Sequence, residues 1–146
     1  MRKEICSGVI PITRVQRDIQ VLLVQHCKGS YWGFPKGHLL DPKEDLQIAA
    51  MRELEEETQL KVLRFLEIEP LQEQYIFFRN GEKISKIVWY YLAETTVRFC
   101  IEREELLDAK WVKLQKLPSY ASYKSSYELI VQAQKAIMKF YKEELL

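Results

Sequence analysis

Short apolar segments rich in β-branched and aromatic residues recur along this chain, and polar turns separate them. Such segments are typical of β-strands. The dipeptide Asn80-Gly81 lies between two of them and predicts a tight hairpin. We expect residues 29–44 to be irregular, because Pro35 and Pro42 exclude a regular helix there. The predicted strands cover residues 7–12, 21–25, 60–68, 71–79, 84–95, 97–101 and 109–114.

Two segments have the apolar spacing of helices that pack one face against a core. The first covers residues 45–58, which contain good helix formers and no breaker. Its predicted packed face comprises Leu46, Ala50, Met51 and Leu54. The second covers residues 125–146, where Ser125 and Glu128 fit a capping box. Its apolar stripe comprises Ile130, Ala133, Ile137 and Tyr141.

This order of elements, many strands with one helix in the middle and one at the end, predicts the fold class. It favours an α/β sandwich, in α/β/α layers, with a mixed central β-sheet. The chain has no internal repeat, low-complexity tract or linker-like segment, and its 146 residues suit one core. We therefore expect a single domain over residues 1–146.

Charge and cysteine content narrow the class of partner. The formal net charge of +1 provides no global field for nucleic acid or an acidic membrane. The apolar run after the basic start is short and contains Pro11, and no stretch approaches the roughly 18 apolar residues of a membrane span. The three cysteines are widely separated and form no C-x-x-C knuckle. We expect a cytoplasmic monomer without nucleic-acid or membrane partners. The charge balance is compatible with a small anionic substrate.

Three glutamates in the first predicted helix share one face. Glu53, Glu56 and Glu57 have i, i+3, i+4 spacing, and each like-charged pair costs a few tenths of a kcal/mol. They also lie near the C-terminal end of the helix, where negative charge is disfavoured. A divalent cation would reverse the repulsion, since Mg²⁺ prefers carboxylate oxygens and brings substrate phosphates with it. The alternative is a solvated acidic face.

The surroundings of these glutamates resemble the Nudix box, G-x5-E-x7-R-E-U-x-E-E-x-G-U, where U is a bulky aliphatic residue. Two departures occur within residues 37–60: six residues rather than five separate Gly37 from Glu44, and Gln59 replaces a glycine. The extra residue falls in a predicted loop, which tolerates insertions. Gln59 either adopts the left-handed cap at a cost of about 1 kcal/mol or lets the helix continue. The matching residues are Gly37, Glu44, Arg52, Glu53, Leu54, Glu56, Glu57 and Leu60.

Outside the box, the chain is similar to the asymmetric diadenosine tetraphosphate hydrolases of this superfamily. The similarity lies in W-G-F-P-K-G-H at 32–38, K-I-V-W-Y-Y-L-A-E-T at 86–95 and an acidic segment before Trp111. It implies hydrolysis of diadenosine tetraphosphate to ATP and AMP, a bis(5′-nucleosyl)-tetraphosphatase activity with Mg²⁺ or Mn²⁺ as cofactor.

The resemblance also implies roles for the residues of the site. One helix glutamate, Glu56 or Glu57 in preference to Glu53, would act as the general base on water that the metal acidifies. Arg52 would pair with a neighbouring glutamate and hold the acidic face rigid. The implied metal ligands are Gly37, Glu53, Glu56, Glu57 and Glu105, with Glu104 as the alternative to Glu105.

Substrate contacts are expected from basic and aromatic side chains. Lys36 and His38 could donate to phosphate oxygens, or else be solvated and cap the loop. Lys124 could reach a terminal phosphate. Rings that could stack on adenine, or belong to the core instead, are Tyr75, Phe77 and Tyr123. We assign His26, Trp32 and Trp111 to packing.

Three other functions fit parts of this pattern. A Nudix hydrolase could act on an oxidised nucleoside triphosphate, a capped or triphosphorylated RNA 5′ end, or an inositol pyrophosphate. A catalytically silent module could bind a nucleotide, although such a module would be expected to lose one of the three glutamates. A structural protein could use the acidic helix for docking, and nothing it does would depend on magnesium.

Overall fold

The computed structural model of the chain describes residues 1–144. The helices are α1 (Leu46–Thr58) and α2 (Lys124–Glu144), with the 3-10 helix η1 (Leu114–Tyr120) before α2. The strands are β1 (Arg2–Val15), β2 (Asp18–His26), β3 (Trp32–Gly33), β4 (Lys36–His38), β5 (Val62–Phe65), β6 (Leu71–Arg79), β7 (Glu82–Thr95) and β8 (Leu106–Lys113).

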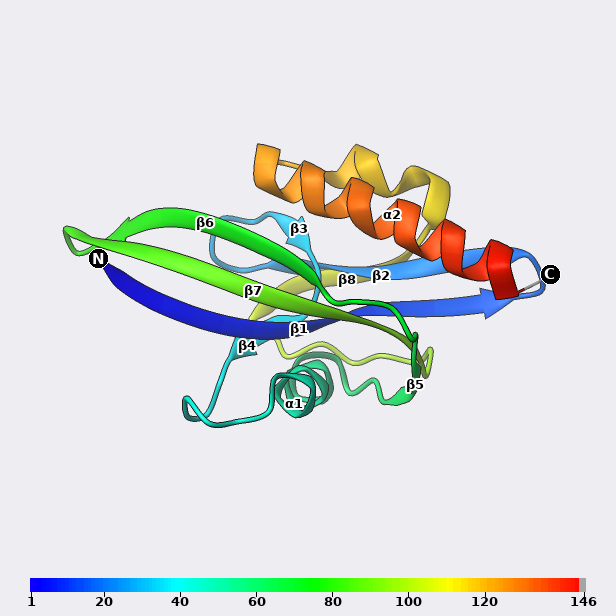
Figure 1. Ribbon diagram of the computed structural model, residues 1–146, viewed down its shortest axis with the longest axis horizontal. Coiled ribbons are helices and arrows are strands. Elements are labelled where there is room, and N and C mark those ends of the chain that lie inside the picture. The colour runs from blue at the N-terminus through cyan, green and yellow to red at the C-terminus, as the bar shows by residue number, and fades with distance from the viewer. Residues whose placement is uncertain (145–146) are drawn as a thin grey trace.

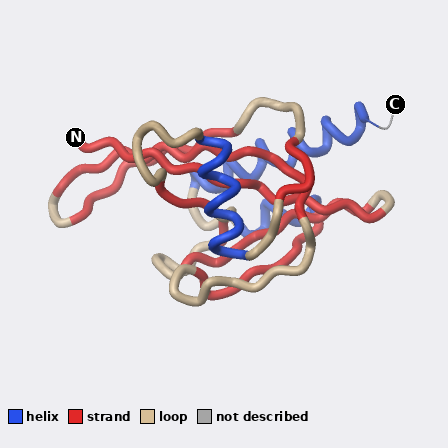
Figure 2. The backbone as a smooth tube through the Cα atoms, turned by 90° about the horizontal axis from the view of Figure 1, so that it is seen from below, coloured by secondary structure: helices blue, strands red, loops and turns tan. Residues whose placement is uncertain are grey.

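These strands form one mixed sheet. Its main order is β3-β2-β1-β7-β5, with β4 paired to β1, β6 to β7 and β8 to β2. The two longest strands, β1 and β7, run parallel from Arg2–Ile84 to Ile12–Glu94, and the other pairings are antiparallel. Helix α2 covers one face of the sheet and α1 covers the other (Figures 1 and 2). The predicted α/β sandwich with a mixed central sheet is confirmed.

Alternation along β1 explains why the sheet has two cores. Ile10 and Ile12 face α2, whereas Val9, which directly precedes Ile10, faces α1. The core under α2 includes the predicted helix stripe of Ile130, Ala133, Ile137 and Tyr141. The core under α1 includes Leu22, Val24, Ala50 and Leu54. No helix within residues 1–144 is long and apolar enough to cross a membrane.

Several predicted boundaries were wrong. Residues 97–101 form no strand, because the amides of Cys100 and Glu102 donate to carbonyls of Thr58 and Glu57 and so bind the end of α1. Within 29–44, which we expected to be irregular, β3 and β4 pair with neighbouring strands on either side of Pro35.

The two helices also differ slightly from expectation. Met51 is 40% exposed, and Ala49 is buried in its place beside Ala50 and Leu54. Helix α2 begins at Lys124, one residue earlier than predicted. The side chain of Ser125, which carried the predicted capping box, and residues 145–146 lie outside the part of the chain that is described.

The end of α1 decides between the two alternatives for Gln59. Its φ of 63° and ψ of 11° are left-handed, and its amide donates to the carbonyl of Glu55 at 2.8 Å. Gln59 therefore adopts the cap that glycine occupies in the Nudix box, and the helix does not continue.

Candidate active site

The N-terminus of α1 is capped by one polar side chain and fixed to the sheet by another. Asp45 accepts hydrogen bonds from the amides of Gln47 and Ile48 at 2.9 and 3.0 Å, as an N-cap residue does. The hydroxyl of Ser7 on β1 donates to the Leu46 carbonyl at 2.5 Å. These contacts set the position of α1 along β1 and bring its C-terminal half, with the glutamates, beside β4.

Glu57 is the most deeply buried of the three glutamates, with 3% of its surface exposed. Its Oε1 accepts a hydrogen bond of 3.0 Å from the main-chain amide of Lys36 in β4. Burial, and then the charge of Glu53, raise the pKa of Glu57 to about 8, although the Lys36 amide acts in the opposite direction. This carboxylate is held in place, but ionising it is costly.

Glu53 lies directly against Gly37, the first residue of the box. A β-carbon at position 37 would overlap the Glu53 carboxylate, so only glycine leaves room for this contact. The guanidinium of Arg52 donates to Oε1 of Glu53 at 3.0 Å. Burial nevertheless raises the pKa of Glu53 above its usual range. The close approach places the main chain of Gly37 beside the Glu53 carboxylate.

Arg52 connects the helix to the loop before it. Its Nε and one terminal nitrogen form a fork on Glu44, with both distances at 3.1 Å. The same nitrogen donates to the His38 carbonyl at 3.0 Å, and the other contacts Glu56 at 3.3 Å as well as Glu53. Arg52 thus pairs with its neighbouring glutamates, as predicted, although its proposed part in catalysis is not tested by this geometry.

The extra residue between Gly37 and Glu44 is accommodated in the loop, and Glu44 keeps its contact with the helix. The Glu44 carboxylate also accepts the Leu40 amide at 2.7 Å, which closes the loop on itself. The Arg52 contact, followed by this amide, lowers the pKa of Glu44. Glu44 therefore works as an anchor for Arg52 and does not face the cavity.

A polar cavity of about 620 Å³ opens beside these residues. Its acidic part is formed by Glu57, Glu104 and Glu105, next to Gly37. The loop with Glu104 and Glu105 is tied to the end of β2 by a 3.0 Å bond from the Cys27 amide to the Glu105 carbonyl. Both candidates for the further carboxylate therefore line this cavity.

The acidic side chains do not converge on a common metal-binding position in this structure. Within residues 1–144, no three His, Cys, Asp or Glu side chains are placed to hold an ion as they stand. Glu56 is 57% exposed and Glu53 is turned toward Arg52, and neither lines the polar cavity. In this arrangement Arg52 and the Lys36 amide provide the positive groups that the glutamates contact.

The donor set nevertheless fits a hard divalent cation. Burial raises the pKa of both Glu53 and Glu57, so their joint ionisation needs a compensating positive charge. Gly37 has no side chain to separate its backbone from Glu53. Carboxylate and carbonyl oxygens together are the ligands that Mg²⁺ accepts.

The polar cavity also has a basic wall. It includes the predicted Lys36 and His38, and also Lys86 and Arg79, which the sequence analysis did not select. Lys86 is only 9% exposed, with its ammonium 5.2 Å from the centre of the Phe77 ring. Burial, and then the nearby Lys36, lower the pKa of Lys86. A lysine at an inward position of an apolar strand was the signal that could have revealed it.

His38 and Arg79 have an acidic partner outside the cavity. The His38 ring contacts Glu4 at 3.2 Å, and Arg79 donates to the same carboxylate at 2.9 Å. Glu4 therefore neutralises part of this edge, with its pKa lowered to about 2 by the Arg79 contact despite burial. The lysines that line the cavity are Lys28, Lys36 and Lys86.

A second, aromatic cavity of about 350 Å³ adjoins the polar one. Tyr31, Tyr75 and Phe77 line both cavities, so they form the boundary between them. Tyr123, 55% exposed, lines the aromatic cavity and meets Tyr31 edge to face with their centroids 5.9 Å apart. The three predicted stacking rings are thus brought together.

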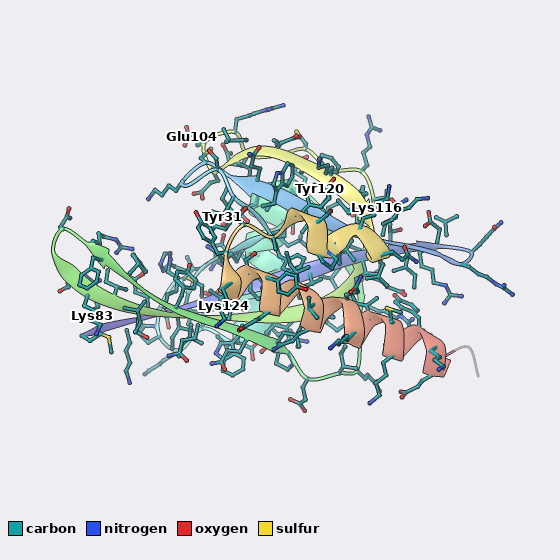
Figure 3. All side chains as sticks on the ribbon, turned by 90° about the horizontal axis from the view of Figure 1, so that it is seen from above. Tyr31, Lys83, Glu104, Lys116, Tyr120 and Lys124 are labelled. Carbon is teal, nitrogen blue, oxygen red and sulfur yellow. The ribbon has the colours of Figure 1, made fainter. Side chains whose placement is uncertain are left out.

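Lys124 is placed differently from the other predicted substrate contacts. It is exposed at the start of α2 and lines neither cavity. Figure 3 shows Tyr31 between the loop of Glu104 and the first turn of α2, where Lys124 lies. Its contact with a terminal phosphate remains a prediction.

His26 is buried beside the cavities, in agreement with a packing role. Its ring stacks on Tyr31 with centroids 4.8 Å apart. Burial lowers its pKa to about 3, so the ring is neutral at physiological pH. Its Nε2 is the buried side-chain atom without a hydrogen-bond partner among the described residues.

An acidic helix end beside the buried Lys86 and the half-buried Lys36, next to a ring-lined cavity, has the character of an enzyme acting on organic phosphates. The NUDIX domain model matches residues 3–133, and the chain belongs to that family and is a Nudix hydrolase. The mRNA-decapping enzyme subunit 2 of Arabidopsis thaliana is 32% identical over 97 residues, which are 66% of this chain. The chain spans only about a quarter of that protein's length, since the match covers 25% of it.

Solved structures share the fold. An Ap4A hydrolase from C. elegans, in a binary complex, has a TM-score of 0.70 and 23% identity, covering 94% of this chain and 99% of that one. The MutT NUDIX hydrolase of Burkholderia pseudomallei has a TM-score of 0.70 and 22% identity, covering 90% and 98%. The NUDIX domain of Shewanella oneidensis NrtR, complexed with ADP ribose, has a TM-score of 0.69 and 20% identity, covering 94% and 90%. At such identities the likeness establishes the fold alone.

Proposed function

We propose that this Nudix hydrolase adds water across a phosphoanhydride bond of dinucleoside polyphosphates and converts diadenosine tetraphosphate into ATP and AMP. The observation that carries the proposal is the junction of the two cavities at Tyr31, Tyr75 and Phe77. One nucleotide can place its base among the rings and its phosphates along the basic wall. The phosphates then pass the acidic end of α1.

A divalent cation, Mg²⁺ or Mn²⁺, would supply charge neutralisation for the phosphates and acidify a water molecule. The residues that would hold it are Gly37, through its carbonyl, and Glu53, Glu56, Glu57 and Glu105. The fit rests on the buried glutamates and on the close approach that Gly37 permits.

The chain's own residues divide the remaining work. As the water oxygen bonds to phosphorus and the bond to the leaving phosphate breaks, a glutamate takes the water proton. Glu57 suits this role because it lines the polar cavity, and because burial raises its pKa, its ionised carboxylate is a stronger base than an exposed one. Glu56 and Glu53 are the alternatives. Lys36, Lys86 and His38 would bind phosphate oxygens, and Arg52 positions the glutamates.

The test is product analysis in ¹⁸O-labelled water with Mg²⁺ and diadenosine tetraphosphate. The expected products are ATP and AMP in equal amounts, with the label in one of them. Two molecules of ADP would exclude asymmetric cleavage, and equal turnover of ATP would contradict the preference for a dinucleotide. Full Mg²⁺-dependent activity of Glu57→Gln would show that the site is wrongly assigned.

A second candidate is supported by the Arabidopsis decapping relative, which is 32% identical over 97 residues. A capped RNA 5′ end presents the same kind of phosphoanhydride. The net charge of +1 does not favour a long RNA contact. A capped oligonucleotide and an oxidised nucleoside triphosphate therefore belong in the same panel. A nucleotide that binds tightly without any turnover across the panel would favour the silent module.

A further inference from the structure

The aromatic cavity contains one charged residue among the described residues that line it, Glu73 of β6. Glu73 has the same inward orientation along β6 as Tyr75 and Phe77, since side chains alternate between the two faces of a strand. It pairs across the sheet with Val88, which belongs to the core under α2. A carboxylate at such a position is unusual in a cavity built for packing rings.

The order of residues along β6 shows which end of the cavity Glu73 occupies. Arg79 lines only the polar cavity, Tyr75 and Phe77 line both, and Glu73 lines only the aromatic cavity. Glu73 is therefore at the end away from the acidic helix and the lysines. When the phosphates of a nucleotide lie in the polar cavity, its ribose lies at the boundary between the cavities and its base extends into the aromatic cavity. The hydrogen-bonding edge of its base, which lies opposite the glycosidic bond, then points toward Glu73.

An ionised carboxylate only accepts hydrogen bonds, and its two oxygens suit two adjacent donors. Guanine offers such a pair, N1–H and the 2-amino group, on this edge. Adenine offers its 6-amino group beside the N1 lone pair, which a carboxylate oxygen repels. Cytosine has the same donor-acceptor pattern, and uracil has a single N–H between two carbonyls. The match is specific to guanine.

We propose that the aromatic cavity selects guanine over adenine, with Glu73 accepting hydrogen bonds from N1–H and the 2-amino group between stacked rings. This inference rests on the proposed function only in taking the aromatic cavity as the base site. It deepens that function, because diguanosine tetraphosphate is then a better substrate than diadenosine tetraphosphate. A guanine nucleotide can come from a free dinucleotide or from a capped RNA end, and a capped oligonucleotide serves as the arm that separates them.

The experiment compares kcat/KM for tetraphosphates that join two guanosines, two inosines or two adenosines. Inosine keeps N1–H but lacks the 2-amino group, so it tests the second hydrogen bond without changing the protein. The expected order is guanosine, inosine, adenosine, with at least about a tenfold difference between the first and the last. Glu73→Gln should reduce this ratio to about one or invert it, because an amide can donate to adenine N1 and accept from its amino group. Glu82→Gln makes the same charge change on the exposed end of β7 and should leave the ratio unchanged.

The outcomes separate the two proposals. Equal turnover of the three compounds by the natural protein, or an unchanged ratio in Glu73→Gln, overturns the guanine assignment while the hydrolase activity stands. If none of them is hydrolysed, the proposed function fails, and the base preference is measured as the Kd of GMP and AMP by quenching of aromatic fluorescence. Equal Kd values then overturn the inference, and a Kd for GMP lower by about tenfold supports it. Cleavage of the capped oligonucleotide but not of diguanosine tetraphosphate would contradict the free dinucleotide as the source.

Discussion

The main-chain amide of Lys36 donates a hydrogen bond of 3.0 Å to the carboxylate of Glu57. The bond joins β4, which precedes the helix, to the last turn of α1. It holds a carboxylate with 3% exposure at the edge of the polar cavity, close to Glu53. The negative charge of Glu57 beside Glu53 therefore opposes folding, whereas a bound cation would offset it. The two effects can be measured separately, as stability without metal and as activity with it.

Replacing Glu57 by glutamine should stabilise the metal-free protein and remove its activity. The pKa of Glu57 is raised from 4.5 to about 8, so its ionisation destabilises the fold progressively as pH rises through that window. In EDTA at pH 8, Glu57→Gln should gain about 2–3 kcal/mol, which is about 5–10 °C in Tm. Activity with Mg²⁺ should fall about 10³-fold.

The same comparison at pH 5 provides the internal control, because most of the difference in Tm should disappear there. Glu55→Gln makes the same change on the exposed side of α1 and should shift neither Tm nor activity appreciably. A metal-free Glu57→Gln protein that is less stable than the natural one at pH 8 would contradict the electrostatic account.

A methyl group at position 37 should separate activity from stability. Gly37 has no left-handed φ, so alanine is compatible with the backbone, but its β-carbon would displace the Glu53 carboxylate. We expect Gly37→Ala to lose about 100-fold in kcat with a change in Tm of about 2 °C or less. The measurement is steady-state kinetics beside calorimetry.

Gly81→Ala is the matched control for Gly37→Ala. Gly81 has a φ of 79° at the hairpin turn, and open space surrounds its β position. The backbone strain should cost about 1 kcal/mol and leave kcat unchanged. If Gly37→Ala kept full activity, the close contact with Glu53 would have no catalytic importance.

The fold was predictable wherever the signal is local. The turn at Asn80-Gly81, with φ values of 51° and 79°, and the acidic face of α1 depend only on neighbouring residues. Residues 97–101 look like a strand but bind the end of α1, and that choice depends on distant partners. The position of Lys86 in the cavity likewise required knowing which face of β7 turns inward and what lies opposite.

The site was predictable in the same uneven way. The box residues predicted that Arg52 pairs with a neighbouring glutamate, and Arg52 contacts Glu53 and Glu56. Its fork on Glu44 was not predicted, although both residues belong to the motif. The grouping of Tyr31 with Tyr75 and Tyr123 combines three segments far apart in sequence. The single carboxylate of Glu73 among these rings had no meaning until the strand order was known.

Arg52→Lys should impair catalysis more than folding. Lysine keeps the charge but cannot form the fork on Glu44 while also contacting the His38 carbonyl. We expect kcat to fall about 10- to 100-fold with little change in KM, because the glutamates lose their alignment rather than their contact with substrate. Glu44→Gln should cause a similar fall, and the double variant should be little worse than either one.

Arg64→Lys is the control for this pair. Arg64 forms a similar fork on Glu94, at 2.9 and 3.1 Å, away from both cavities. Its replacement should lower Tm by a few degrees and leave kcat unchanged. Additive losses from Arg52→Lys and Glu44→Gln would show that the two residues act separately.

Gln59→Gly should stabilise the protein, since Gln59 occupies the left-handed cap of α1 with φ 63°. Its side chain is exposed, so no packing is lost, and relief of strain exceeds the added freedom of the unfolded chain by about 0.5–1 kcal/mol. The expected rise in Tm is about 1–4 °C, measured by calorimetry. Gln47→Gly, the same change in the right-handed first turn of α1, should lower Tm by a similar amount. A shift of both variants in the same direction would mean that the conformation of residue 59 is not what limits the stability of this helix end.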